Sequence, residues 1–126
     1  MKSILLVALG GGLGSVARYA LGGWVLHHTV DWRFPLGTFV VNVFGCLVAG
    51  LLAALAERYE FFPPEARVFL FAGLLGGFTT FSAFGLETMF LLRRGEIFVA
   101  GANVVASVVF GLLAFWVGLK LVSSTQ

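Results

Sequence analysis

The sequence has few charged residues and a single cysteine, and these two shortages exclude several classes of protein. Only 11% of its 126 residues are charged and 60% are hydrophobic, whereas a soluble domain of this size needs much more charge on its surface. The eight basic residues do not form the clustered patch that binds nucleic acid. Cys46 has no second cysteine for an internal disulfide, and its apolar surroundings are typical of a small packed residue.

The motifs of common enzymes are also missing. The sequence has no Ser-His-Asp set, no CxxC and no HExxH. His27 and His28 are adjacent in a predicted connection, where we expect them to be solvated. The glycines of residues 10–14 are only superficially similar to a nucleotide-binding loop, because they lie inside an apolar run. We therefore predict that the protein is not an enzyme.

Long apolar runs are abundant instead. Four segments stand out, at residues 4–26, 34–56, 68–92 and 97–119. Each is at least as long as the roughly 20 residues that span a bilayer, and the connections between them are short. Residues 1–126 are therefore predicted to form one all-α membrane unit of four transmembrane helices. Gly10 and Gly14 are four residues apart in the first segment, a spacing that favours close approach of a neighbouring helix.

The third segment contains a run that a membrane helix does not normally carry. Residues 73–84 read Gly-Leu-Leu-Gly-Gly-Phe-Thr-Thr-Phe-Ser-Ala-Phe. Adjacent glycines are poor helix formers, and the hydroxyls of Thr79, Thr80 and Ser82 can bond to nearby backbone in place of the helical ladder. We predict a third helix that is broken mid-membrane, with a tilted continuous helix as the alternative. Carbonyls freed at Gly76 and Thr79 would suit a cation.

Polar side chains within a bilayer are costly, so each needs a partner. Arg18 either snorkels or caps a broken helix, or it draws anions toward a vestibule. Glu87 either pairs with Arg18 or reaches the membrane interface. Asn42 in the second segment can donate two hydrogen bonds and either joins helices or lines a pore. The same two interpretations apply to Asn103 and Ser107, which are four residues apart in the fourth segment.

Taken together, these side chains predict a path for a small anion. The candidate donors are all neutral, with no lysine or carboxylate pair among them: Asn42, Thr80, Ser82, Asn103 and Ser107. Phe78, Phe81 and Phe84 recur at every third residue and so are expected to share one helical face. Ring edges carry partial positive charge. Such a lining can replace the water around an anion without holding it too tightly to leave.

Basic residues are nearly balanced between the two sides of the predicted bundle. Four lie on the side of the termini and three on the other: Lys2, Arg58, Arg67 and Lys120 against Arg33, Arg93 and Arg94. The excess that normally marks the cytoplasmic side is almost absent. A protein without a preferred orientation can insert both ways and pair as an antiparallel homodimer. A weakly biased protein that inserts one way is the alternative.

Three motifs resemble those of the small bacterial fluoride channels of the Fluc, or CrcB, family. They are Gly-Gly-x-Gly-Ser-x-x-Arg-Tyr (11–19), Gly-Thr-x-x-Val-Asn-x-x-Gly (37–45) and Gly-Gly-x-Thr-Thr-Phe-Ser-x-Phe (76–84). The resemblance covers all four segments, and the third motif is highly specific. It implies an antiparallel, dual-topology homodimer in the bacterial inner membrane, which exports fluoride passively through two pores and protects the cell against fluoride toxicity.

The resemblance also implies roles for particular residues. A structural sodium ion at the centre of the dimer would be held by the backbone carbonyls of Gly76 and Thr79 from both subunits. Each fluoride pathway would be lined by Phe81, Phe84, Asn42, Asn103 and Ser107. The chain departs from the family pattern at Ala83, where many members have threonine, and at Asn103, where some have tyrosine.

Two other functions are compatible with four short-looped helices. A small dual-topology, proton-coupled multidrug exporter also has four helices. Such an exporter requires a membrane-buried carboxylate in its first helix. This chain has Arg18 there and no acidic residue in that segment. A non-transporting assembly subunit would use its polar residues only to hold helices together.

Overall fold

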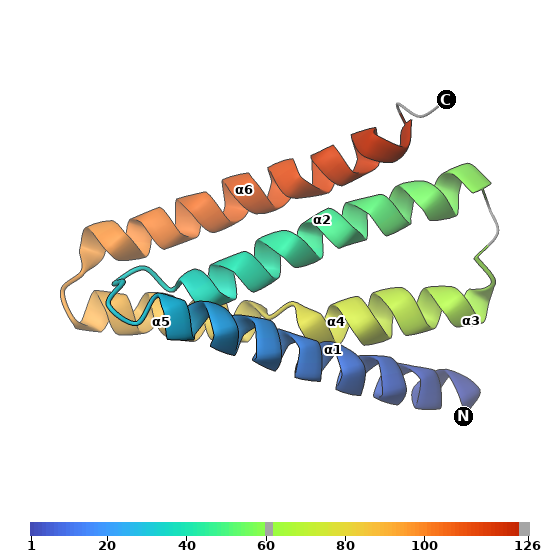
Figure 1. The fold of residues 1–126 in the computed structure, drawn as a ribbon, viewed down its shortest axis with the longest axis horizontal. Helices are drawn as coiled ribbons and strands as arrows, with labels where there is room; N and C mark the ends of the chain where they lie inside the picture. The colour runs from blue at the N-terminus through green and yellow to red at the C-terminus, as the bar shows by residue number, and fades with distance from the viewer. Residues whose placement is uncertain (60–61, 124–126) are drawn as a thin grey trace.

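The computed structural model describes residues 1–59 and 62–123, and every regular element within them is a helix (Figure 1). Three helices are long: α1 (Lys2–His28), α2 (Leu36–Tyr59) and α6 (Ile97–Ser123). Four consecutive pieces make up the rest: α3 (Pro64–Arg67), the π-helix η1 (Val68–Leu75), α4 (Gly76–Phe78) and α5 (Phe81–Arg93).

Four stretches of the described residues are long and apolar enough to cross a membrane. They are Lys2–His28, Leu36–Arg58, Pro64–Arg93 and Ile97–Ser123. The prediction of an all-helical chain with four such spans is therefore confirmed. The second helix begins at Leu36, two residues later than predicted, and the Pro35 carbonyl accepts a hydrogen bond from the Phe39 N–H at 3.2 Å.

The helices associate as two pairs. α2 packs along α6, and α1 packs along η1 and α4. Smaller contacts between α1 and α2 and between α5 and α6 join the pairs. The start of α1 and the end of α6 lie at the end of the bundle where α2 finishes and α3 begins (Figure 1). The opposite end holds the connections from α1 to α2 and from α5 to α6 (Figure 1).

Glycine allows α1 to lie directly against the backbone of the third span. A Cβ atom at Gly14 would lie 2.1 Å from the carbonyl oxygen of Leu74. From the other side, a Cβ atom at Gly77 would lie 2.4 Å from the carbonyl oxygen of Gly11. Real Cβ atoms do not approach other atoms so closely, so side chains at these positions would force the helices apart. The small-residue spacing noted in the first segment is used at this contact.

Helical dihedral angles stop at two residues of the third span. Thr79 has φ −86° and ψ 153°, and Thr80 has φ −147° and ψ 114°, so both are extended. Gly76 has φ −61° and ψ −38°, which is helical. The irregular residues are therefore Thr79 and Thr80 and not the adjacent glycines. The sequence had suggested both pairs, because glycine is a poor helix former and threonine hydroxyls bond to nearby backbone.

Candidate functional site

The Asn42 side chain on α2 holds the extended residues. Its Nδ2 donates to the carbonyl oxygen of Thr80 at 3.0 Å, and the Thr80 N–H donates to Oδ1 at 2.8 Å. One amide thus pairs with both backbone groups of a single residue, as a neighbouring strand would. Because an asparagine amide carries two N–H donors, one donor remains beyond this pair.

The threonine hydroxyls at this point bond to nearby backbone. The Thr80 Oγ1 accepts from the Ala83 N–H at 3.1 Å and caps α5, and it lies 3.3 Å from the Ser82 Oγ. The Thr79 Oγ1 donates to the carbonyl oxygen of Leu75 at 2.9 Å, which also accepts from the Thr79 N–H at 3.0 Å. The Thr79 hydroxyl therefore bonds to the backbone at the end of α4, and the Thr80 hydroxyl bonds to the backbone at the start of α5.

The carbonyls of Gly76 and Thr79 lose their helical donors to side chains in this arrangement. In a continuous α-helix the N–H of each residue bonds to the carbonyl four residues earlier. The Thr80 N–H would then serve Gly76, but it bonds to Asn42. The Ala83 N–H would serve Thr79, but it bonds to the Thr80 hydroxyl. The carbonyls of Gly76 and Thr79 are the two that the sequence suggested for a cation.

Main-chain oxygens are the natural ligands for a cation here. Among the residues that the structure describes, no group of three His, Cys, Asp or Glu side chains could hold a metal ion. Carbonyl oxygens without donors suit a hard monovalent cation such as sodium, because they offer partial negative charge without thiolate or imidazole. The carbonyls of Gly76 and Thr79 fit that requirement.

Arg18 reaches the same segment from α1. Its Nε donates to the carbonyl oxygen of Gly77 at 3.2 Å, and the side chain is half-buried. The sequence left three roles open for Arg18: snorkelling, capping a broken helix, or drawing anions toward a vestibule. This contact corresponds to the capping role. The bond joins α1 to α4, one residue before the last of that helix.

Glu87 on α5 bonds to Thr38 on α2 and not to Arg18. The Thr38 hydroxyl donates to the Oε1 of Glu87. The Oε2 of Glu87 is buried and has no hydrogen-bond partner among the residues that the structure describes. The predicted pairing of Glu87 with Arg18 is therefore wrong, because Glu87 bonds to Thr38 and Arg18 bonds to the Gly77 carbonyl. Sequence reasoning did not single out Thr38, although it belongs to the second motif quoted above.

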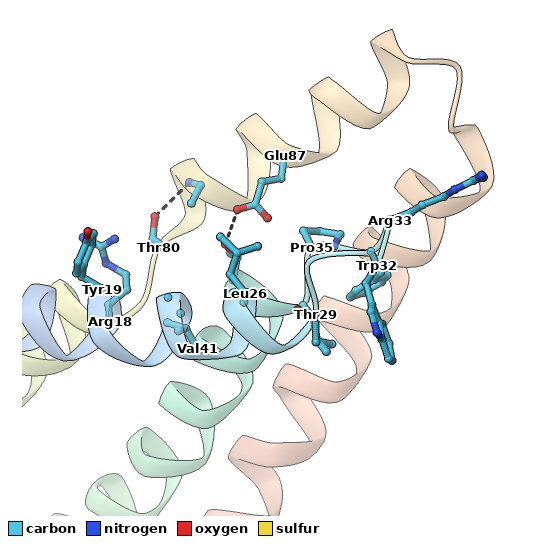
Figure 2. A pocket seen from close by; sticks show the side chains of 17 residues that line it. Arg18, Tyr19, Leu26, Thr29, Trp32, Arg33, Pro35, Val41, Thr80 and Glu87 are labelled. Carbon is cyan, nitrogen blue, oxygen red and sulfur yellow. Dashed lines mark hydrogen bonds between the residues drawn. The ribbon is translucent and has the colours of Figure 1, made fainter.

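A cavity of about 660 Å³ brings Arg18 and Glu87 to one space (Figure 2). Thr38 and Thr80 also line it, and most of the remaining wall is apolar or aromatic. Arg33 lies at its edge and points away from the other charged groups (Figure 2). The exposed Arg33 guanidinium forms an ion pair with Glu96 at 3.5 Å. A guanidinium and a carboxylate therefore share one open cavity without pairing.

A second cavity, of about 470 Å³, also borders Thr80. It brings together five of the residues predicted for the site: Asn42, Gly76, Thr79, Thr80 and Phe81. They come from α2, α4, the extended pair and the start of α5, so the packing of α2 on the third span is what assembles them.

The aromatic residues do not share a single face. Phe81 and Phe84 are neighbours on α5, with ring centroids 5.5 Å apart and an interplanar angle of 40°. Phe78 lies before the extended residues and packs against Phe44 on α2, with centroids 6.1 Å apart and an angle of 64°. The predicted common face is wrong for Phe78, since two extended residues change the direction of the chain. Phe81 is 83% exposed in the single subunit.

Asn103 and Ser107 lie in a polar chain between α5 and α6. Asn103 is 2% exposed, and its Nδ2 donates to the Thr88 Oγ1 at 2.9 Å. The Ser107 hydroxyl donates to the Asn103 Oδ1 at 3.3 Å, and Thr88 donates to the carbonyl oxygen of Phe84 at 2.7 Å. Neither of the two cavities described above includes Asn103 or Ser107. Within the subunit these contacts join helices.

The four spans and the polar cluster around an irregular third span define a small multi-span membrane protein. Residues 5–119 match the family described as CrcB-like protein, Camphor Resistance (CrcB). The chain belongs to this family, and the resemblance seen in its motifs is confirmed.

Several curated relatives cover nearly the whole chain. A protein of Methylobacillus flagellatus is 57% identical over 126 residues, which is 100% of this chain and 98% of the relative. One of Opitutus terrae is 48% identical over 120 residues, 94% of this chain and 90% of the relative. One of Flavobacterium psychrophilum is 46% identical over 119 residues, 94% and 95% respectively. Each is named Fluoride-specific ion channel FluC, a channel and not an enzyme, in agreement with the prediction.

Proposed function

We propose that the chain is a subunit of a fluoride-selective channel that lets cytoplasmic fluoride leave the cell by passive electrodiffusion. The observation that carries this proposal is 57% identity, over the full length of the chain, to a relative named Fluoride-specific ion channel FluC. The geometry around Thr80 supports it, because neutral donors and aromatic rings gather there without a lysine or a carboxylate pair.

The pathway begins at the larger cavity and passes the extended residues. Arg18 gives the cavity a positive charge that favours the entry of anions. The pathway is then lined by neutral groups, which are Asn42, Thr80, Ser82, Phe81, Phe84, Asn103 and Ser107. The remaining Nδ2–H of Asn42 and the ring edges of Phe81 and Phe84 replace part of the water around fluoride.

The extended pair is the mid-membrane break of the third helix. Thr79 and Thr80 lie near the middle of the span Pro64–Arg93, where backbone groups without partners cost several kcal/mol each. Asn42 supplies both partners for Thr80. A structural sodium ion held by the carbonyls of Gly76 and Thr79 supplies the rest, and its role is to hold this backbone in place.

A second copy of the chain completes the site. Phe81 is 83% exposed and Gly76 is exposed in the single subunit, although both border the cavity at the break. An antiparallel partner covers them, doubles the set of carbonyls around the cation and gives two pores. The near balance of basic residues between the two sides permits both orientations.

Passive export is sufficient for protection. Fluoride enters as its neutral acid from an acidic medium and ionises in the more alkaline cytoplasm, where the anion is trapped. An inside-negative membrane potential drives the anion outward through a pore. At ~2.3 kcal/mol per charge per 100 mV, and about 1.4 kcal/mol per decade of concentration, roughly a fiftyfold gradient can be sustained.

Ion efflux from vesicles tests the proposal. The purified chain is reconstituted into vesicles loaded with potassium fluoride or potassium chloride, and a potassium ionophore starts the efflux. We expect rapid fluoride efflux, little chloride efflux and no need for a proton gradient. Equal efflux of chloride contradicts the selectivity. Dependence on a proton gradient favours the exporter, and the absence of any efflux favours a non-transporting subunit.

A further inference from the structure

Arg18 has a hydrogen bond that its role as a charge in the cavity does not require. We propose that Arg18 is a positioning residue for the cation site at the break: its bond to the Gly77 carbonyl withdraws that oxygen and leaves the carbonyls of Gly76 and Thr79 to hold the ion. This inference rests on the sodium site of the proposed function. It assigns to Arg18 a task that concerns the cation and not the anion.

The carbonyls on either side of the break fall into two groups. The oxygens of Gly77 and Thr80 are bonded by side chains from other helices, Arg18 at 3.2 Å and Asn42 at 3.0 Å. The oxygens of Gly76 and Thr79 lose their helical donors to side chains. The carbonyls in the first group accept hydrogen bonds from side chains, and those in the second group are free of their helical donors and can face a cation. Arg18 therefore occupies the Gly77 oxygen and leaves the preceding one, on Gly76, to hold a cation.

The packing of α1 explains how Arg18 reaches this point. Gly14 and Arg18 are four residues apart and lie on the same face of α1. The lack of a side chain at Gly14 lets α1 approach the Leu74 carbonyl, where a Cβ atom would be 2.1 Å away. One turn further along, the Arg18 side chain meets the next turn of the third span. The close contact at Gly14 thus places Arg18 within hydrogen-bonding distance of the Gly77 carbonyl.

Gly76 and Gly77 need such an external contact. Glycine restricts its own backbone less than any other residue, and neither residue has a side chain that could fix the direction of its carbonyl. The charged hydrogen bond from Arg18 fixes the peptide that carries the Gly77 oxygen. Because Gly77 is helical within α4, fixing this peptide also restricts the direction of the Gly76 carbonyl.

Two matched substitutions distinguish the effect of the hydrogen bond to the Gly77 carbonyl from the effect of the positive charge on Arg18. Arg18→Gln places a neutral N–H donor at the same number of bonds from the backbone as the Arg18 Nε, whereas Arg18→Met places a methyl group there. The midpoint of thermal unfolding is measured for purified protein at increasing sodium chloride, with choline chloride keeping the ionic strength constant. Arg67→Met is the control, because the Arg67 Nε also donates to a backbone carbonyl, that of Phe62 at 3.3 Å, in an exposed position on α3.

We expect sodium to raise the midpoint of the wild-type protein. Arg18→Met should need about tenfold more sodium than the wild type for the same rise, since a hydrogen bond from a charged donor has a net value of this order. Arg18→Gln and Arg67→Met should stay within about threefold of the wild type. Arg18→Lys, which keeps a donor, serves if the methionine variant does not fold, and its sodium requirement should then be raised by less than about tenfold.

Each other outcome overturns the inference in a recognisable way. If Arg18 acted by repelling the cation, both Arg18→Gln and Arg18→Met would bind sodium more tightly. If it only stabilised the fold, the midpoint would fall by the same amount at every sodium concentration. A wild-type midpoint that does not respond to sodium would contradict the sodium site itself. A response that is unchanged in Arg18→Met would contradict only the role of Arg18.

Discussion

The amide of Asn42 is the only described side chain that bonds to both backbone groups of Thr80. Asn42→Ala removes both bonds, and Asn42→Asp keeps an acceptor for the Thr80 N–H but sets a carboxylate against the Thr80 carbonyl. We expect fluoride efflux to fall by about tenfold or more in both variants, because a lost buried bond costs about 1–3 kcal/mol. Efflux from vesicles and thermal unfolding measure the two effects.

Val48→Ala is a suitable control for Asn42. It lies on the same helix and lines neither of the two cavities described. It should lower the midpoint of unfolding while efflux per folded protein is kept. If Asn42→Ala behaved in the same way, the amide would have no specific role in conduction.

Phe81 is largely exposed in the single chain. Since its side chain is 83% exposed there, Phe81→Leu should change the free energy of unfolding of the subunit by less than about 1 kcal/mol. It removes the ring edge, so we expect fluoride efflux to fall by about tenfold or more. Phe98→Leu on α6 is the matched control, because that ring is 93% exposed and borders neither cavity described. Equal efflux from the two variants would show that the ring of Phe81 is not used.

Single polar residues could be predicted from the sequence more readily than their partners. Asn42, Arg18 and Glu87 stand out because each is polar within an apolar run. Their partners are not visible in the sequence, because Thr80 is 38 residues from Asn42 and Thr38 is 49 residues from Glu87. Such pairs are decided by which helices pack together, and hydrophobicity alone does not specify that.

At the scale of elements, the third span was the one predicted to be irregular. Composition predicted a break at the Gly-Gly and Thr-Thr pairs of residues 76–80, whereas the structure has helical dihedral angles at Gly76 and extended ones at Thr79 and Thr80. The extended backbone depends on Asn42 from another helix, so local propensity could not specify it. The π-helix η1 was not predicted, because Val68–Leu75 has the apolar composition of an ordinary membrane helix.

The contact between α1 and the third span depends on where the glycines lie and not on their number. Gly14→Ala would place a Cβ atom 2.1 Å from the Leu74 carbonyl oxygen, so α1 must move. Overpacking of this kind costs about 1–3 kcal/mol, and the shift would also carry Arg18 away from Gly77. We expect a lower midpoint of unfolding and a loss of most fluoride efflux.

Gly12→Ala provides the control on the same helix. A Cβ atom at Gly12 meets nothing within 4 Å in the subunit, and alanine favours a helix over glycine by about 1 kcal/mol. Its midpoint should equal or exceed that of the wild type. A Gly14→Ala variant as stable as Gly12→Ala would contradict the packing described for α1.

At the scale of the whole molecule, one subunit leaves much apolar surface uncovered. Only 11–28% of each spanning window is buried within the subunit. Lipid covers part of that surface, and the proposed antiparallel copy covers the rest. The number of spans could be predicted from apolar run length. The pairing of α2 with α6, and of α1 with the third span, could not, since all four runs are similar in composition.

The balance of basic residues gives a test of the antiparallel dimer. Replacing Arg93 and Arg94 with alanine leaves Arg33 alone on its side, against four basic residues on the other. An opposite variant replaces three residues, in Lys2→Ser, Arg67→Ala and Lys120→Ser. Each should insert in one orientation, because the side with more Lys and Arg stays in the cytoplasm. A reporter fused after α6 measures the orientation.

Neither variant should conduct alone, because subunits of one orientation cannot form antiparallel pairs. We expect fluoride efflux to fall by about tenfold or more for each, in proportion to the few subunits that still insert in the minority orientation, and to return when the two variants are expressed together. Arg93→Lys with Arg94→Lys is the control, since it keeps the charge and should conduct like the wild type. Full efflux from a variant shown to have one orientation would mean that the pores form without an inverted partner.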